Sequence, residues 1–350
     1  MPLCVRQLFL CAALAAPLAA SAPPLLRALA LLDTEDDDAQ VAGVVAVDAS
    51  SGAVTAVGAN FSWATQAATS LDCATAFAPG GSGGGRWLSV IGAGPSVAAV
   101  DAATGALLGV SPALAPSYVV ASVSFDARTG ALVAVAQAAN GSVDLVSINA
   151  TSGAVAVLAR GLAGLRFPEP CQSAISLATG TLYVVGLDAE NDDADQVVDA
   201  YDLTGAKLAS VPWPATTAGA VGRPVAVPPA AAGGGDDLVL VWAAPGAGPS
   251  RPLRLLQLDV RTAAQRVLAE LPEKYAGAVV DIGGQSAQTP ARAADGSFSL
   301  TFFVFDNPTD AQLVLRVGPV APGATGPPAD VALTALNGAG FLWSPALILQ

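Results

Sequence analysis

Residues 121–159 read ASVSF-DARTG-ALVAVAQ-AANG-SVDLVSI-NATSG-AVAVL-A, and this stretch decides the fold. Short apolar runs rich in Val and Ala alternate with turn formers, as strands and hairpin turns do. In DARTG and NATSG the Asp or Asn can accept a bond from the backbone two residues on, and the Gly takes the positive φ that closes the turn. The stretch predicts four antiparallel strands at Ala121–Phe125, Ala131–Gln137, Ser142–Ile148 and Ala154–Leu158.

The same turn recurs along the chain as an apolar pair, Asp or Asn, Thr or Ser, Gly and a second apolar run. Full copies begin at Asp48, Asp101, Asp126 and Asn149, and shortened or eroded copies begin at Leu177, Asp202 and Asp259. Leaving out the two midway copies at Asp126 and Leu177, successive copies lie 48 to 57 residues apart. A repeating unit of about 50 residues that holds four antiparallel strands is typical of a propeller blade.

Laid along the chain, this unit predicts an all-β fold, a six-bladed β-propeller of four-stranded antiparallel blades. Five blades are expected near residues 66–115, 116–165, 166–217, 218–273 and 274–335. Residues 25–65 supply three further strands and residues 340–350 supply one. The two ends together therefore complete a sixth blade, which closes the ring and leaves no free sheet edge there. A seventh blade within the weakly patterned residues 306–340 is the alternative.

The segment Ala99-Val100-Asp101-Ala102-Ala103-Thr104-Gly105 resembles the A-x-D-x-x-T-G hairpin of quinoprotein-like and related propeller repeats. The resemblance extends over most of the chain and implies the fold, not an activity. Quinoprotein dehydrogenase repeats carry a Trp four residues after the Gly, and those enzymes have more blades. This chain has Gly109, Ala134 and Val157 at that place. A quinone cofactor is therefore not expected.

Composition removes several kinds of chemistry. The 350 residues include no His, which excludes Ser-His-Asp and Cys-His catalysis and His-ligated zinc. The net charge of −13 repels the phosphates of nucleic acids and anionic lipids. We therefore expect a protein or a glycan as partner and no nucleic acid, and we expect a monomer.

The N-terminus is typical of a secretory signal peptide over residues 1–21, followed by one propeller domain over residues 22–350. Arg6 supplies the positive charge, Leu8–Ala16 the apolar segment and Leu18–Ala22 the small residues for cleavage. An uncleaved anchor is the alternative. With the signal removed, we expect a secreted, extracellular protein that does not insert into a membrane.

Two further features agree with export. Asn60, Asn140 and Asn149 each begin an Asn-x-Ser/Thr sequence and are predicted N-glycosylation sites. Cys73 and Cys171 remain after signal cleavage, and an even pair in an exported chain favours a disulfide bond. Two buried free thiols are the alternative.

Two acidic loops stand out because together they hold ten of the 28 acidic residues. One contains Asp33, Glu35 and Asp37, and the other contains Asp188, Glu190 and Asp192. Each follows one strand and precedes the strand that ends in the Asp turn, so the two are the same loop in the first and fourth blades. Their carboxylates are candidate calcium ligands. The alternatives are solvated charge runs and a docking surface for a basic partner.

Polar residues also precede the first strands of several blades, where loops enter the central channel. Asp72, Glu169 and Asp281 are candidate ligands of a central metal ion. Their positions are similar to those of the metal ligands in six-bladed calcium-dependent lactonase-like propellers, although the Glu/Asn/Asp set of that family is not recognisable. The alternative is that they line a wet channel.

These observations predict an extracellular binding or scaffold propeller that recognises a protein or glycan through one face. The alternative is a calcium-dependent hydrolase or isomerase with its site over the central channel. Calcium is the one cofactor that the sequence suggests, and no catalytic residue is assigned.

Overall fold

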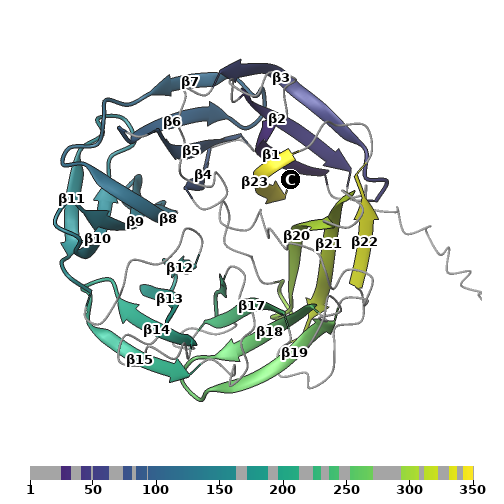
Figure 1. The fold of residues 1–350 in the computed structure, drawn as a ribbon. Coiled ribbons are helices and arrows are strands. Elements are labelled where there is room, and N and C mark those ends of the chain that lie inside the picture. The colour runs from purple at the N-terminus through teal and green to yellow at the C-terminus, as the bar shows by residue number, and fades with distance from the viewer. Residues whose placement is uncertain are drawn as a thin grey trace, which may run out of the picture.

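The computed structural model describes residues 25–32, 41–48, 50–62, 74–80, 84–92, 94–162, 172–187, 196–212, 224–229, 236–243, 253–270, 293–306, 311–321, 331–336 and 342–349. Their regular structure is entirely β, in six sheets arranged as a ring (Figure 1). The chain is therefore a six-bladed β-propeller, as the repeat predicts.

The second and third blades take their strands in chain order, whereas the first blade begins with the last strand of the chain. The first blade contains β23 (Leu342–Leu349), β1 (Leu25–Leu32), β2 (Val41–Asp48) and β3 (Val54–Ser62). The second contains β4 (Thr75–Pro79), β5 (Gly85–Ile91), β6 (Ser96–Asp101) and β7 (Leu107–Val110). The third contains β8 (Tyr118–Asp126), β9 (Ala131–Ala138), β10 (Val143–Ile148) and β11 (Val155–Ala159).

The remaining three blades complete the ring. The fourth contains β12 (Ser173–Ser176), β13 (Thr181–Leu187), β14 (Gln196–Asp202) and β15 (Lys207–Pro212). The fifth contains β16 (Val225–Val227), β17 (Asp237–Ala243), β18 (Leu253–Asp259) and β19 (Ala264–Glu270). The sixth contains β20 (Phe298–Asp306), β21 (Ala311–Val320) and β22 (Val331–Ala335).

Ring closure joins the two ends of the chain in one sheet. β23 pairs antiparallel with β1, from Leu26 opposite Leu349 to Leu32 opposite Leu342. Figure 1 shows β23 beside β1, with the C-terminus next to the blade formed by the N-terminal strands. The inner edge of β1 is therefore paired, and the predicted closure of the ring by N- and C-terminal strands is confirmed.

The sixth blade has three strands within the described part of the chain, whereas each of the other five has four. Residues 271–292, between β19 and β20, lie outside the described residues. The sequence alternative of a seventh blade within 306–340 finds no support, because the described residues of that stretch belong to β20, β21 and β22 of this same sheet.

The predicted turn chemistry is present in atomic detail. In the β10–β11 hairpin, Asn149 Oδ1 accepts the backbone N–H groups of Thr151 and Ser152, each at 3.0 Å. Gly153 closes the turn at φ +68°. The prediction of four strands in the third blade is also confirmed. The ends of β8 to β11 differ from the predicted ends by at most three residues.

The apolar core lies between blades rather than inside them. One buried cluster joins Ala76, Leu88 and Val90 of the second blade to Leu132 and Val146 of the third. A second cluster joins Val135 and Leu145 of the third blade to Leu182, Val184 and Tyr201 of the fourth. The many Ala and Val side chains suit this arrangement, because small residues let neighbouring sheets pack face to face.

The outer hairpins of four blades also pack on the preceding blade, which the sequence pattern does not predict. A Cβ atom added at Gly153 would lie 2.4 Å from the Pro112 carbonyl oxygen of the second blade. A Cβ atom at the corresponding glycines would also lie within 3 Å of the preceding blade: 1.8 Å from Ala335 at Gly52, 2.1 Å from Val57 at Gly105 and 2.7 Å from Ala159 at Gly205. At these positions glycine therefore serves both the turn and the contact between blades.

No helix long and apolar enough to cross a membrane occurs in the described ranges.

Candidate functional site at the ends of the channel

The first strands of five blades follow one another around the axis of the ring, which we call the central channel. β23 contacts β4, β4 contacts β8, β8 contacts β12, and β12 contacts β16. Figure 1 shows β4, β8 and β12 on the inner side of their blades. Residues at the ends of these strands therefore define the two ends of the channel.

Hydrogen bonds between β8 and β12 fix the direction of these inner strands. Ser122 Oγ lies 2.5 Å from Ser173 Oγ, and Ser124 Oγ donates to the Ile175 carbonyl oxygen at 3.4 Å. Both pairs are 51 residues apart, so β8 and β12 run parallel to each other. The inner strands therefore begin at a common end of the ring, which we call the entrance end.

The opposite end of the ring carries the Asp turns, because strands alternate in direction within each blade. The first-to-second and third-to-fourth strand connections lie there, and we call this end the turn face. Its turn residues in the described ranges are Asp48, Asp101, Asp126, Asn149, Asp202 and Asp259. The two ends thus differ in the kind of loop that they present.

The residues predicted from the sequence to bind metal or to form a disulfide lie outside the described residues. These are Asp72, Glu169 and Asp281, the acidic-loop residues Asp33, Glu35, Asp37, Asp188, Glu190 and Asp192, and the two cysteines Cys73 and Cys171. Their flanking strands are described. Asp72 stands three positions before β4, and Glu169 stands four positions before β12. Metal binding and disulfide pairing by these residues stay predictions.

The strands that flank the two acidic loops occupy equivalent places. One loop follows β1 and precedes β2, and the other follows β13 and precedes β14. In both blades these are the second and third strands counted from the channel. The order of the flanking strands is therefore the one expected if the two loops are equivalent, and the loops themselves lie outside the described residues.

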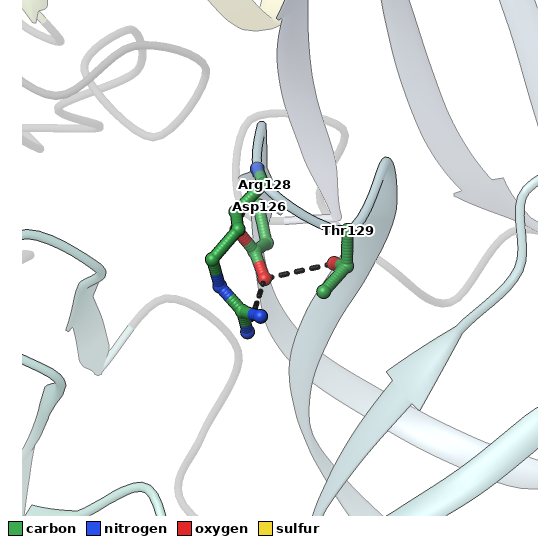
Figure 2. Close-up of polar contacts among 3 residues, drawn as sticks. All are labelled: Asp126, Arg128 and Thr129. Carbon is green, nitrogen blue, oxygen red and sulfur yellow. Dashed lines mark hydrogen bonds and ion pairs between the residues drawn. The ribbon is translucent and has the colours of Figure 1, made fainter.

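The turn carboxylates make hydrogen bonds and ion pairs within their own turns. In Figure 2, Asp126 Oδ2 accepts the Thr129 hydroxyl at 2.8 Å and faces the Arg128 guanidinium at 3.5 Å. Burial acts to raise the pKa of Asp126, but the bonds from Thr129 and the Arg128 backbone outweigh it and lower that pKa. The Ser50 hydroxyl and backbone N–H lower the pKa of Asp48 to about 2. These groups stay ionised at neutral pH and hold turns.

Three further carboxylates, those of Asp144, Asp199 and Asp236, are buried, and the sequence pattern did not single them out. Asp236 accepts hydroxyl hydrogen bonds from Ser176 and Tyr183, each at 2.8 Å, and from Thr179. The Ser and Tyr donors belong to β12 and β13, whereas Asp236 directly precedes β17 of the next blade. Burial, followed by the charge of Asp236, raises the pKa of Tyr183. Asp236 therefore links two blades.

The other two buried carboxylates bind partners in their own blade or in the segment that directly follows it. Asp144 accepts the Tyr118 hydroxyl at 3.1 Å and the Gly161 backbone N–H at 2.9 Å. Asp199 accepts the Ser210 hydroxyl at 2.6 Å and pairs with Lys207 Nζ at 2.9 Å. An Asp inside an otherwise apolar strand is the signal that could have identified both. Their partners make them structural groups.

The described ranges contain no group of three or more Cys, Asp or Glu side chains able to hold a metal ion. The three Asn residues predicted as glycosylation sites are all exposed. Asn60 lies in β3, and Asn140 and Asn149 lie in the two turns that flank β10.

No family model and no curated protein matches the chain. Solved structures do match. A propeller from Bacteroides fragilis, provisionally named 6-phosphogluconolactonase, has 11% identity and a TM-score of 0.42, over 95% of this chain and 99% of that one. A Bacteroides uniformis propeller with the same provisional name has 10% identity and a TM-score of 0.45, over 94% and 100%. The periplasmic gluconolactonase of Pseudomonas aeruginosa has 16% identity and a TM-score of 0.35, over 89% and 99%.

These matches correct the main functional expectation from the sequence. A binding or scaffold propeller was expected because the chain has no His and no recognisable ligand set. These three solved structures, which match over most of their length, are named as lactonases, which are hydrolases. The alternative, a hydrolase with its site over the channel, fits them better. The expectation rested on the absence of His, which excludes only His-dependent hydrolysis.

Proposed function

We propose that this protein is an exported hydrolase that opens a neutral sugar lactone at the entrance end of its channel. The observation that carries the proposal is the parallel course of β8 and β12, given by the Ser122–Ser173 and Ser124–Ile175 contacts. We propose that the residues just before these strands lie at the end where the strands begin. Asp72 and Glu169 precede such strands in the sequence, and Asp281 precedes the sixth sheet.

Carboxylates suit this reaction in a protein without His. A lactone is a cyclic ester, and its hydrolysis needs a water molecule to attack the carbonyl carbon while the ring C–O bond breaks. A carboxylate can accept the proton of that water as a general base. Calcium held by such carboxylates would polarise the carbonyl group. The proposed ligands lie outside the described residues, so no step is assigned to calcium.

Charge favours an uncharged substrate. The chain has a net charge of −13 and only 15 Lys and Arg residues. Its field opposes the approach of a phosphate group. We therefore propose a neutral sugar lactone rather than a phosphorylated one.

Export belongs to the same proposal. Cleavage of the signal peptide would leave an extracellular glycoprotein that is monomeric, is not inserted in a membrane and binds no nucleic acid. A bond between Cys73 and Cys171 would then join the segments that precede β4 and β12. Mass spectrometry of the exported chain under non-reducing conditions checks the N-terminus and the disulfide together.

The test of the hydrolase is acid release from a neutral sugar lactone, followed at constant pH with the purified chain. We expect a rate above that of spontaneous hydrolysis, and a lower rate after calcium chelation that added calcium restores. A heat-denatured sample is the control. A rate equal to the spontaneous one would refute the proposal, and an active protein that is insensitive to chelation would remove calcium from it.

A further inference from the structure

The third-to-fourth strand turns of three blades have the same geometry. Gly52 donates its N–H to the Asp48 carbonyl at 2.8 Å, Gly105 to Asp101 at 2.9 Å, and Gly153 to Asn149 at 2.9 Å. In each turn the backbone N–H of the first residue also donates to the carbonyl of the residue after the glycine. These distances are 2.9 Å for Asp48, 2.8 Å for Asp101 and 2.9 Å for Asn149. The three turns are therefore structurally equivalent, although one begins with Asn and two begin with Asp.

The side chain that begins each turn acts through one oxygen. Asp48 Oδ1 accepts the backbone N–H of Ser50 at 2.8 Å, and Asp101 Oδ1 accepts that of Ala103 at 3.0 Å. Asn149 Oδ1 accepts the N–H of Thr151 at 3.0 Å. The hydrogen bonds given for the Asn149 side chain all use Oδ1, so the turn has no need of its amide nitrogen.

Asn stands at 149 where the equivalent turns have Asp48 and Asp101. The position two residues later varies among the three turns and is Thr151 here. Asn149 and Thr151 together make the acceptor sequence Asn-Ala-Thr, in which the hydroxyl residue is as necessary as the Asn. The turn itself does not require Asn at 149, since Asp builds the same geometry in the two equivalent turns.

We propose that Asn149 carries an N-linked glycan, a proposal that rests on the proposed export. Asn149 is exposed at the turn face, and its Nδ2 is free to bear a substituent while Oδ1 keeps the turn. The donor is a lipid-diphosphate-linked oligosaccharide of the secretory pathway. The Asn149 nitrogen bonds to the anomeric carbon and loses one proton, while the bond from that carbon to phosphate oxygen breaks and the lipid diphosphate leaves.

The glycan would stand on the turn face, opposite the entrance end. Asn149 lies in the β10–β11 turn, whereas the β9–β10 turn with Asn140 lies at the entrance end. A glycan at Asn149 therefore leaves the proposed lactone site open. Hydrolysis should be the same before and after its removal.

The test uses the chain secreted from a eukaryotic host, once with its own N-terminus and once with a host leader before residue 22. The chain is cut between Asn140 and Asn149, and the mass of the peptide containing Asn149 is measured before and after enzymatic deglycosylation. We expect a glycan mass on this peptide of the wild-type protein, which Asn149→Asp and Thr151→Ala each abolish. Asn149→Asp keeps the Oδ1 acceptor, so its unfolding midpoint should match that of deglycosylated wild type.

A variant that gains a glycosylation sequence provides a matched positive test. Asp48→Asn turns Asp48-Ala49-Ser50 into an acceptor sequence within an equivalent turn, and we expect one additional glycan there. An unmodified Asn149 in protein secreted with the host leader would overturn the proposal. Failure of only the native N-terminus to direct secretion would instead refute export, and lactone hydrolysis is measured separately.

Discussion

The Tyr183 hydroxyl of one blade donates to Asp236 Oδ2 of the next at 2.8 Å. Asp236 is 4% exposed and also accepts hydroxyl bonds from Ser176 and Thr179. A hydrogen bond to a buried charged group contributes about 1.5–3 kcal/mol. This group therefore holds the fourth and fifth blades together beyond their apolar contact.

Tyr183→Phe should lower the free energy of unfolding by about 1.5–3 kcal/mol, because it removes one donor from a buried carboxylate. Asp236→Ala should lower the free energy of unfolding by about 2–4 kcal/mol, because it leaves several hydroxyl groups without their acceptor. Urea unfolding of both variants and of the double variant measures their coupling. Effects that add to within about 0.3 kcal/mol would show that the two residues do not act together.

Gly153→Ala should be more destabilising than Gly130→Ala, although both glycines have a positive φ, +68° and +71°. A methyl at Gly153 meets Pro112 of the preceding blade, whereas one at Gly130 meets nothing within 4 Å. We expect a loss of about 1–2 kcal/mol at Gly130 from backbone strain alone, and a clearly larger loss at Gly153. Equal losses in urea unfolding would argue against the contact between blades.

Ala263→Gly should stabilise the protein. Ala263 has a φ of +57° in the eroded turn of the fifth blade, where other blades have Gly. The left-handed conformation costs Ala about 1–2 kcal/mol, and the greater freedom of Gly in the unfolded chain offsets about half of that. We expect a net gain of about 0.5–1 kcal/mol, seen as a higher melting temperature. A lower melting temperature would contradict this interpretation of the turn.

Stability should fall at low pH through the turn carboxylates. The pKa of Asp48 is lowered from 3.8 to about 2, and those of Asp101, Asp202 and Asp295 are also lowered. A folded pKa below the unfolded one gives stability that is present above about pH 4 and is lost as the pH falls towards about 2. The urea midpoint should decline over this window. A midpoint that is constant from pH 6 to pH 2 would be the opposite result.

The turn motif was sufficient to predict much of the fold. Asp126, Asn149 and their glycines mark hairpins whose spacing sets the blade, and the leftover strands at the two ends predict the closure by β23. These features are local or periodic, so they are visible in one sequence. The contact of Gly153 with Pro112 is not, because nothing local distinguishes a glycine that a neighbouring blade touches from one that it does not.

The site was harder to predict for the same reason. Asp236 gains its partners from another blade, more than 50 residues away in the chain. Asp72 and Glu169 lie outside the described residues, in segments that carry no repeat pattern, so their sequence positions predict an end of the ring but no geometry. Reaction class depends on which side chains converge, and one sequence does not show that convergence.

The account's central claim is that lactone hydrolysis takes place at the entrance end of the channel. It is tested most directly by the rates of Asp72→Asn, Glu169→Gln and Asp281→Asn on a neutral sugar lactone, with the turn-face variant Asp259→Asn as matched control. We predict that the entrance variants lose most of the activity, at least tenfold for one of them, while Asp259→Asn retains it. Full activity in all three entrance variants would contradict the claim.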